Sequence, residues 1–297
     1  MPKVNVSPKN FPELAIPLLE VDSMRYPFFY SEDVIRNMSE VTCWDDDVMI
    51  CGYMRSGTHW CYEILNMLLN KTTETVPHTK HDLHVEKVNG KTLDAVTSPR
   101  VFNGHMQFCR LPKQVIEKRV KVIYLLRDPR DVAVSWYQLM EKNFRYRGGL
   151  TICPFPDWLN LFLDGELEWG SWFDHVTSWE RAMLQHQHHP ILVVHYEDLI
   201  SDPRGEIIRM NRFLGMDADD EFCGQVATAC HISNMKKNKY NITEVLNGET
   251  VNYNKGQVGS WRSWFTREMS DHFNQIYDKK MRYSRFHSKY IRGGGVA

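Results

Sequence analysis

Three short apolar runs constrain the fold of this 297-residue chain more than any other feature. Each is rich in aliphatic residues, and the runs cover 47–51, 120–126 and 191–195. Runs of this length and composition are typical of strands that are buried on both faces. Helical patterns accompany them at about 58–70, 131–142 and 171–188. Because strands alternate with helices, we predict an α/β fold whose mainly parallel central sheet is covered by helices on both sides.

The rest of the pattern fits one domain over residues 1–297, because neither a linker nor an internal repeat is visible. We expect an N-terminal extension at about 1–20 and a frayed tail at about 293–297. Further helices are predicted at 204–214, 219–230 and 266–283. The stretches 144–169 and 238–258 are rich in Gly, Asn and aromatic residues, and we predict that they are long surface segments.

The charge balance excludes some partners. The chain carries 36 basic and 37 acidic residues, so no overall field attracts nucleic acid or an anionic membrane. No apolar run approaches the roughly 18 residues of a membrane span, and residues 1–11 do not have the pattern of a signal peptide. The seven cysteines form no C-x-x-C pair, which is typical of reduced thiols. We therefore expect a cytoplasmic protein without a nucleic-acid or membrane partner.

The segment between the first strand and the first helix has the composition of a phosphate-binding loop. Gly52 and Gly57 let the backbone come close to a ligand, and a helix that begins at Thr58 directs its first amide groups toward an anion. Arg55 adds a positive charge and Ser56 adds a hydroxyl donor. A nucleotide triphosphate loop requires Lys where this chain has Thr58, which disfavours an ATPase or kinase. A plain turn that uses glycine for its backbone freedom stays open.

A second cation lies at the end of the next strand. Arg127 directly follows the run 120–126, and Ser135 lies on the helix after it. The carboxyl ends of parallel strands share one edge of a sheet, where ligands collect. Arg55 and Arg127 are therefore predicted to face one anionic ligand that carries phosphates at two places. The alternative is a surface ion pair between Arg127 and Asp131.

Both segments resemble motifs of the cytosolic sulfotransferases. Gly52–Trp60 resembles their 5′-phosphosulfate loop, and Arg127–Tyr137 resembles their 3′-phosphate motif. The resemblance continues in the same order along nearly the whole chain, at 98–105, 172–176, 195–199, 235–238, 255–256, 259 and 261. It implies a fold like that of P-loop nucleotide kinases. It also implies sulfonate transfer from 3′-phosphoadenosine 5′-phosphosulfate (PAPS) to a hydroxyl or amine of a small organic acceptor, without a metal.

The resemblance assigns roles to individual residues at the matching positions. The 5′ end and the adenine would be bound by Arg55, Ser56, Gly57, Thr58, His59 and Trp60, with Tyr196 also on the adenine. The 3′-phosphate would be bound by Arg127, Ser135, Lys255 and Gly256. The expected catalytic residues are His105, Arg55 and Ser135. His105 would take the proton of the acceptor, and Arg55 would stabilise charge on the leaving oxygen.

The chain departs from the family pattern at several places, four of which lie at or near the expected site. Arg55, His59 and Asn103 stand where the family usually has Lys, Thr and Lys, and Ile232 replaces an aromatic residue near the adenine. Because Arg is bulkier and holds its proton more firmly than Lys, the first change is not conservative. We consider that His59 partly replaces the missing cation. The departures keep open a nucleotide-binding protein with weak or no transferase activity and, as a more distant alternative, a P-loop phosphotransferase that requires ATP and magnesium.

The acceptor and the oligomeric state are less constrained. Seven aromatic residues form either an acceptor pocket or part of the core: Trp136, Tyr137, Phe144, Tyr146, Phe155, Trp158 and Trp169. We favour a phenol, whose pKa lies nearer that of histidine, over a hydroxysteroid or an amine. His78, His81 and His84 are expected on a solvated surface rather than at a metal. A homodimer is possible, but its usual segment is altered in this chain by Arg267.

Overall fold

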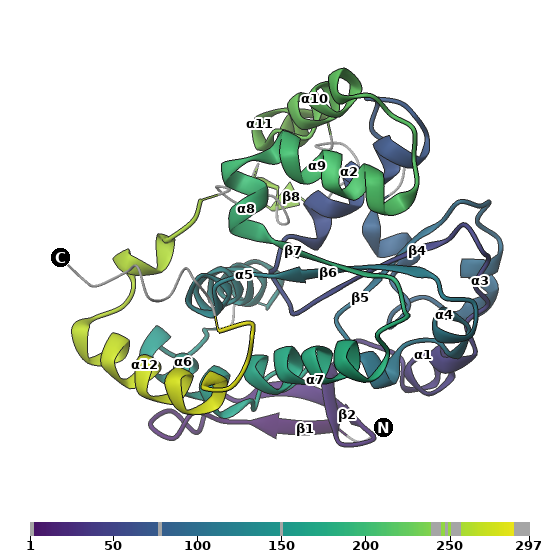
Figure 1. Cartoon of the computed structure of the whole chain (residues 1–297). Helices are drawn as coiled ribbons and strands as arrows, with labels where there is room; N and C mark the ends of the chain where they lie inside the picture. The colour runs from purple at the N-terminus through teal and green to yellow at the C-terminus, as the bar shows by residue number, and fades with distance from the viewer. Residues whose placement is uncertain are drawn as a thin grey trace.

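A parallel sheet of four strands forms the centre of the fold (Figure 1). The computed structural model describes residues 3–76, 79–148, 151–238, 245–246, 249–250 and 257–287. The strands are hydrogen-bonded in the order β5-β4-β6-β7, and these three pairings are parallel. Their bounds are Val48–Gly52 for β4, Val101–Gly104 for β5, Lys121–Leu126 for β6 and Ile191–His195 for β7. The predicted parallel sheet is confirmed, and β5 is an additional strand that the apolar runs do not reveal.

The predicted helices are present. They are α2 (Thr58–Leu69), α5 (Pro129–Gly148), α7 (Trp172–Gln185), α9 (Pro203–Leu214), α10 (Asp220–Ala229) and α12 (Arg267–Met281). Other helices are α1 (Glu32–Asn37), α3 (Gly90–Asp94), α4 (Lys113–Glu117), α6 (Phe155–Asp164), α8 (Tyr196–Ser201) and α11 (Ile232–Asn238). Single 3-10 turns cover Met38–Glu40, Lys80–Leu83, Phe108–Arg110 and Ser260–Ser263.

Side chains alternate across β4, so the two faces of the sheet pack against different helices. Val48 and Ile50 pack with α2, α9 and α10. Met49 and Cys51 pack on the opposite face with α4 and α7. Figure 1 shows α9 and α10 above the sheet and α7 below it. The result is a single α/β domain, as predicted, and within the described ranges no helix is long and apolar enough to cross a membrane.

Residues 3–27 form a second, antiparallel sheet instead of the expected extension. Its strands are β1 (Lys3–Val6), β2 (Ile16–Val21) and β3 (Met24–Pro27), and β2 lies in the middle. Leu18 and Tyr26 are fully buried in a core cluster that includes residues of α5, α6 and α12. The prediction of an extension at 1–20 is therefore wrong for the described part of that segment. A two-stranded pair, β8 (Val245–Leu246) with β9 (Glu249–Thr250), lies later in the chain.

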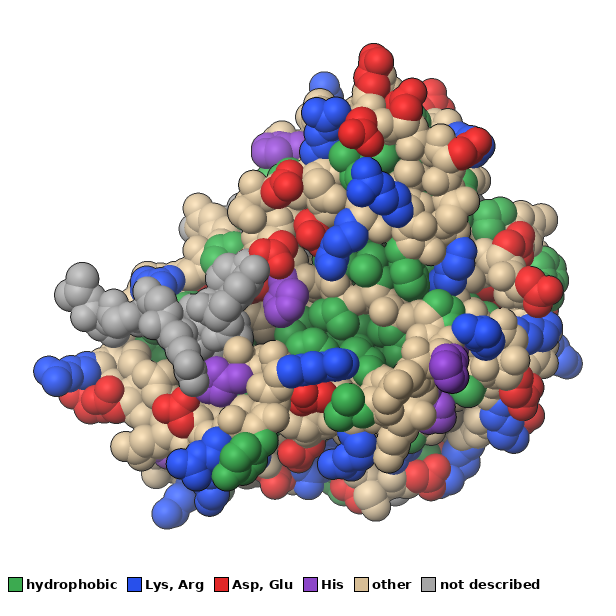
Figure 2. All heavy atoms as spheres, in the orientation of Figure 1, with side chains coloured by type: hydrophobic (Ala, Val, Ile, Leu, Met, Phe, Trp, Pro, Cys, Tyr) green, Lys and Arg blue, Asp and Glu red, His purple; other side chains and the backbone are tan. Residues whose placement is uncertain are grey.

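The strand β7 was predicted to be buried on both faces, but it lies at an edge of the sheet and is mostly only partly buried. Of its five residues only Val194 is buried. A hollow of about 500 Å³ lies along this edge and is lined by Ile191 and Val193 together with basic side chains such as Arg209. In Figure 2, apolar side chains are exposed on the face in view, with Lys, Arg and His side chains at their border. The predicted site residues within the described ranges do not line the hollow.

The segment 144–169 is also more buried than predicted. It contains α6, in which Trp158 and Phe162 are four residues apart and lie in the core. Their spacing puts both side chains on one face of the helix, which packs against α5 and α12. Trp158, one of the aromatic residues considered for an acceptor pocket, thus serves as packing surface together with Phe162.

Candidate active site

The loop after β4 is shaped for close contact with a ligand. Gly57 precedes α2 with a φ of +98°, a backbone conformation that favours glycine. A Cβ atom at Gly57 would lie 2.7 Å from Cδ2 of Tyr196, so no larger residue fits without displacement. The hydroxyl oxygen of Ser56 is buried and has no hydrogen-bond partner among the described residues. The loop therefore keeps a donor available for a bound group.

Arg55 and Arg127 lie together at the carboxyl edge of the sheet, as predicted. Nη1 of Arg127 donates a hydrogen bond to the backbone oxygen of Arg55 at 2.9 Å, and Nε of Arg55 donates to Oγ of Ser135 at 3.1 Å. Burial, and next the charge of Arg127, lower the pKa of Arg55 to about 10, so the Arg55 guanidinium group stays charged at neutral pH. Two like charges held together favour an anionic ligand between them.

Asp131 is not the partner of Arg127 that the alternative interpretation requires. Its carboxylate accepts hydrogen bonds from the backbone N–H of Gly259 at 2.6 Å and of Trp261 at 2.9 Å, and from the hydroxyl of Ser260 at 2.9 Å. These bonds tie the segment from 259 to 261 to the start of α5. The predicted cofactor-binding residues Lys255 and Gly256 precede this segment and lie outside the described residues.

The aromatic residues predicted for the adenine are neighbours. The ring centroids of Trp60 and Tyr196 are 6.0 Å apart, and the rings are inclined by 75°. The guanidinium carbon of Arg127 lies 4.2 Å from the centroid of the Tyr196 ring, close enough for a cation–π contact. Nε1 of Trp60 and Nε of Arg127 are buried without a hydrogen-bond partner in the described part of the chain. Both N–H groups are therefore available to donate hydrogen bonds to a ligand that has acceptor atoms near these rings.

His105 has the tautomer that a base requires. Its Nδ1 lies 2.8 Å from the backbone oxygen of Gly52, and since that oxygen only accepts, Nδ1 carries the hydrogen and Nε2 carries the lone pair. His105 is 2% exposed. Burial, and next the charge of Lys80, hold the pKa of His105 well below its usual value. The ring is therefore neutral at physiological pH.

A buried carboxylate fixes the position of His105. Oε2 of Glu86 accepts the backbone N–H of His105 at 2.6 Å and lies 3.1 Å from Nε2 of His84, while Oε1 accepts Nε1–H of Trp169 at 2.8 Å. Trp169 also packs against the imidazole of His105, with ring centroids 4.9 Å apart. Glu86, His84 and Trp169 thus form one side of the site.

The other aromatic candidates for an acceptor pocket are mainly core. Trp136 and Trp158 are buried and pack edge to face, with centroids 5.7 Å apart. Tyr137 packs in the same way on Phe155 at 5.2 Å. Phe144 is partly buried against this cluster, and the side chain of Tyr146 lies outside the described residues. Trp169, in contrast, contacts the imidazole of His105.

Sequence analysis missed three residues of the site: Lys80, His84 and Glu86. His84 and Glu86 are buried, so the expected solvated surface is wrong for His84, while His78 lies outside the described residues. For His84 and Glu86 the missed signal is their alternation with Leu83 and Val85, a two-residue period that is typical of extended chain. Among the described residues no group of three or more His, Cys, Asp or Glu side chains can hold a metal ion.

His59 is buried beside Lys80 and His81. Burial, and next the charge of Lys80, lower its pKa well below the usual value, and its ring lies 5.1 Å from that of His81. A neutral His59 ring disfavours the role of a replacement cation, which stays a prediction that turnover of His59→Thr tests. Ile232, the fourth departure, is partly buried against the cluster that contains α2 and α10.

Comparisons with known proteins point to one family. The profile of the sulfotransferase domain matches residues 45–285. Sulfotransferase 1B1 of Canis lupus familiaris is 30% identical over 295 residues, which cover 93% of this chain and 96% of that protein. Sulfotransferase 1E1 of Bos taurus is 32% identical over 269 residues, which cover 83% and 87%. Mouse sulfotransferase SULT7A1, solved as a complex with PAP, aligns with a TM-score of 0.77 at 26% identity over 93% of this chain and 99% of its own. This chain therefore belongs to the sulfotransferase family.

Proposed function

We propose that this protein transfers a sulfonate group from PAPS to the hydroxyl of a small organic acceptor, with a phenol preferred. The observation that carries the proposal is the pair Arg55 and Arg127, linked at the carboxyl edge of the sheet, beside donors without partners among the described residues. Such a pair suits one ligand with phosphates at two places. The PAP complex of the mouse relative supports the same ligand class.

In this proposal each residue around the cosubstrate has its own role. PAPS would supply the sulfonate group and leave as 3′-phosphoadenosine 5′-phosphate (PAP). Arg55, oriented by Ser135, would stabilise the charge that develops on the leaving oxygen. Arg127 would hold the 3′-phosphate with Ser135, and Trp60 and Tyr196 would contact the adenine. Lys255 and Gly256 complete the proposed set.

His105 would act as the base. The Nδ1–H bond to Gly52 fixes the ring and leaves Nε2 to accept the proton of the acceptor. The low pKa of His105 makes it a weak base, which favours an acceptor that gives up its proton easily. A phenol, with a pKa of about 10, meets this condition better than an aliphatic hydroxyl.

The function is tested by ligand binding followed by turnover. PAP is expected to raise the melting temperature of the protein in a thermal-shift titration, whereas ATP with magnesium is not. Sulfonate transfer is then measured with phenol and with cyclohexanol, which is similar in size. We expect cyclohexanol to react at least about tenfold more slowly. Stabilisation by ATP and magnesium alone contradicts the proposal, and PAP binding without transfer to phenols, sterols or amines identifies a binding protein without transferase activity.

Substitution of Gly57 tests the phosphate loop. Gly57→Ala is expected to raise the Kd for PAP by about tenfold or more, because a Cβ atom both strains the +98° φ and meets Tyr196. Isothermal titration calorimetry measures the change. Gly90→Ala is the matched control, since a Cβ atom at Gly90 has no heavy atom within 4 Å. Equal affinities of the two variants for PAP contradict the assignment of the loop.

A further inference from the structure

Lys80 places an amine between the phosphate loop and the base. Its side chain is buried, with 3% of the residue exposed. Nζ donates a hydrogen bond to Oγ1 of Thr58 at 2.8 Å and lies 3.4 Å from Nε2 of His105. Thr58 is the first residue of α2, directly after the loop, and Nε2 is the basic nitrogen of His105. Lys80 thus lies between Thr58 at the phosphate loop and the basic nitrogen of His105, and in the proposed reaction the sulfonate group lies between these two.

Two separate contacts hold Lys80 in this position. Nδ2 of Asn103 donates to the backbone oxygens of Lys80 at 2.6 Å and of Leu83 at 3.2 Å. Thr79 and Asp82 form a capping box at the start of the turn, with the N–H of Thr79 bonded to the Asp82 carboxylate at 2.8 Å. The amide at 103, where the family usually has Lys, therefore anchors the segment that delivers Lys80.

The environment of Lys80 is not that of a structural ion pair. No carboxylate lies within ion-pair distance of Nζ in the described part of the chain, although Glu86 acts on it from farther away. A buried ammonium group without such a partner is costly, and an apolar side chain would fill the same space without that cost. Burial lowers the pKa of Lys80 to about 7. An anionic ligand bound next to Nζ would offset the free-energy cost of burying the ammonium group.

We propose that Lys80 is a further catalytic residue, which supplies the second positive charge of the reaction centre from a different segment of the chain than residue 103. The inference rests on the proposed function. In transfer, the acceptor oxygen bonds to sulfur, and the bond from sulfur to the phosphate oxygen breaks with its electron pair on that oxygen. The acceptor proton passes to Nε2 of His105. Lys80 keeps its proton and stabilises the negative charge of the sulfonate oxygens.

The pH dependence follows from the groups that face Lys80. Deprotonation of Lys80 removes its charge, so kcat/KM, which reports the free enzyme, is expected to fall as the pH rises through about 7. The neighbouring groups do not reverse this sign: Glu86 raises the pKa of Lys80 and Arg55 and Lys87 lower it. The nearby imidazoles with lowered pKa values are neutral in this range: His59, His81, His84 and His105.

Lys80→Met tests the proposal, with Lys91→Met on the exposed face of α3 as the control for loss of one positive charge. We expect Lys80→Met to lower kcat for phenol about 100-fold. We also expect it to raise the Kd for PAPS several-fold more than the Kd for PAP, because the lost charge acts on the sulfonate. In the protein without ligand, an NMR titration is expected to show a higher pKa of His105, because the charge of Lys80 lowers it.

The outcomes separate the two proposals. A wild-type protein that binds neither PAP nor PAPS overturns the proposed function. A wild-type protein that transfers sulfonate, together with a Lys80→Met variant equal to Lys91→Met in kcat and in the ratio of the two Kd values, overturns the role of Lys80 alone. If Lys80→Met does not fold, the wild-type profile decides: a kcat/KM that stays level from pH 7 to about 9 overturns that role.

Discussion

His105→Gln is expected to lower kcat for sulfonate transfer by about 10²–10⁴-fold, the usual contribution of a general base. Glutamine is close to histidine in size and still donates a hydrogen bond, so the contact with the Gly52 oxygen can survive. Glutamine has no basic nitrogen at the position of Nε2, so it cannot take the proton of the acceptor. Since His105 is not placed among the groups that bind the phosphates, the Kd for PAP is expected to change little. Initial rates with phenol and calorimetric titration with PAP measure the two effects.

The control for this variant is His188→Gln, because His188 is exposed and lies outside the site. The pH profile gives an independent check. The pKa of His105 lies well below its usual value, so protonation removes the base only at a pH well below that value, and the acid side of the wild-type kcat/KM profile is expected to fall only there. A His105→Gln variant that keeps more than a tenth of the wild-type kcat contradicts the role of His105.

Much of this site is predictable because its residues are adjacent to strands that are readable from sequence. Arg127 directly follows the buried run that becomes β6, Arg55 lies in the loop just after β4, and the parallel strands bring both to one edge. His105 follows β5 in the same way, although that strand is only four residues long and gives no clear apolar run. In this case the motif resemblance, rather than the local pattern, locates the residue.

The residues that sequence analysis missed reach the site through tertiary contacts. Lys80 and Glu86 lie in a polar stretch, and their burial depends on hydrogen bonds to Asn103 and His105, more than 18 residues away in the chain. Nothing local distinguishes such a lysine from a solvated one. The same limit explains why β7 was expected to be buried on both faces, since its composition does not reveal that no strand pairs with its outer edge within the described residues.

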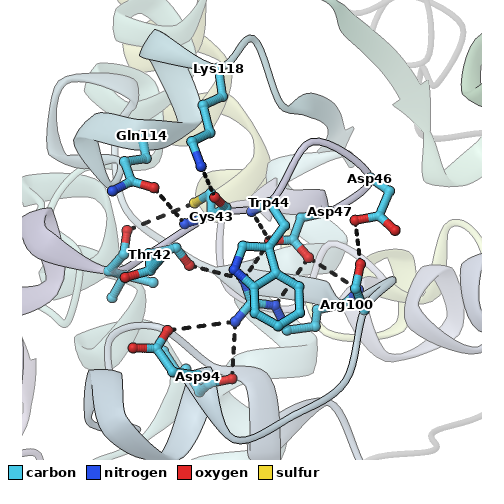
Figure 3. A network of polar contacts seen from close by, with 12 residues as sticks. Thr42, Cys43, Trp44, Asp46, Asp47, Asp94, Arg100, Gln114 and Lys118 are labelled. Carbon is cyan, nitrogen blue, oxygen red and sulfur yellow. Dashed lines mark hydrogen bonds and ion pairs between the residues drawn. The ribbon is translucent and has the colours of Figure 1, made fainter.

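A buried ion pair lies at the amino ends of β4 and β5, whereas Arg55 and His105 follow the carboxyl ends of these strands. Arg100, next to β5, donates from Nε to Oδ1 of Asp47 at 3.0 Å and from Nη2 to Oδ2 at 2.7 Å (Figure 3). Both residues are almost completely buried. The guanidinium group also donates to the backbone oxygens of Leu93 and Thr42, and it lies 4.3 Å from the ring centroid of Trp44. Asp47 directly precedes β4, so this network fixes the start of two central strands.

Asp47→Ala is expected to destabilise the protein by about 3–5 kcal/mol, because it leaves the charge of Arg100 buried without a carboxylate in bidentate contact. For a chain of this size, that loss corresponds to a fall in Tm of roughly 5–15 °C. Asp94 is a weak substitute, since its nearest oxygen lies 3.7 Å from Nη1. Differential scanning calorimetry measures the change, and Asp45→Ala, on the exposed loop beside it, controls for loss of one negative charge.

The double variant Asp47→Ala, Arg100→Leu separates the ion pair from simple packing. Removing both charges also removes the uncompensated guanidinium, so part of the lost stability is expected to return. A cost that comes only from lost side-chain volume would instead grow with the second substitution. A Tm of Asp47→Ala within 2 °C of Asp45→Ala would show that Asp94 and the backbone oxygens suffice to satisfy Arg100, and that the entry of β4 into the sheet does not depend on the pair.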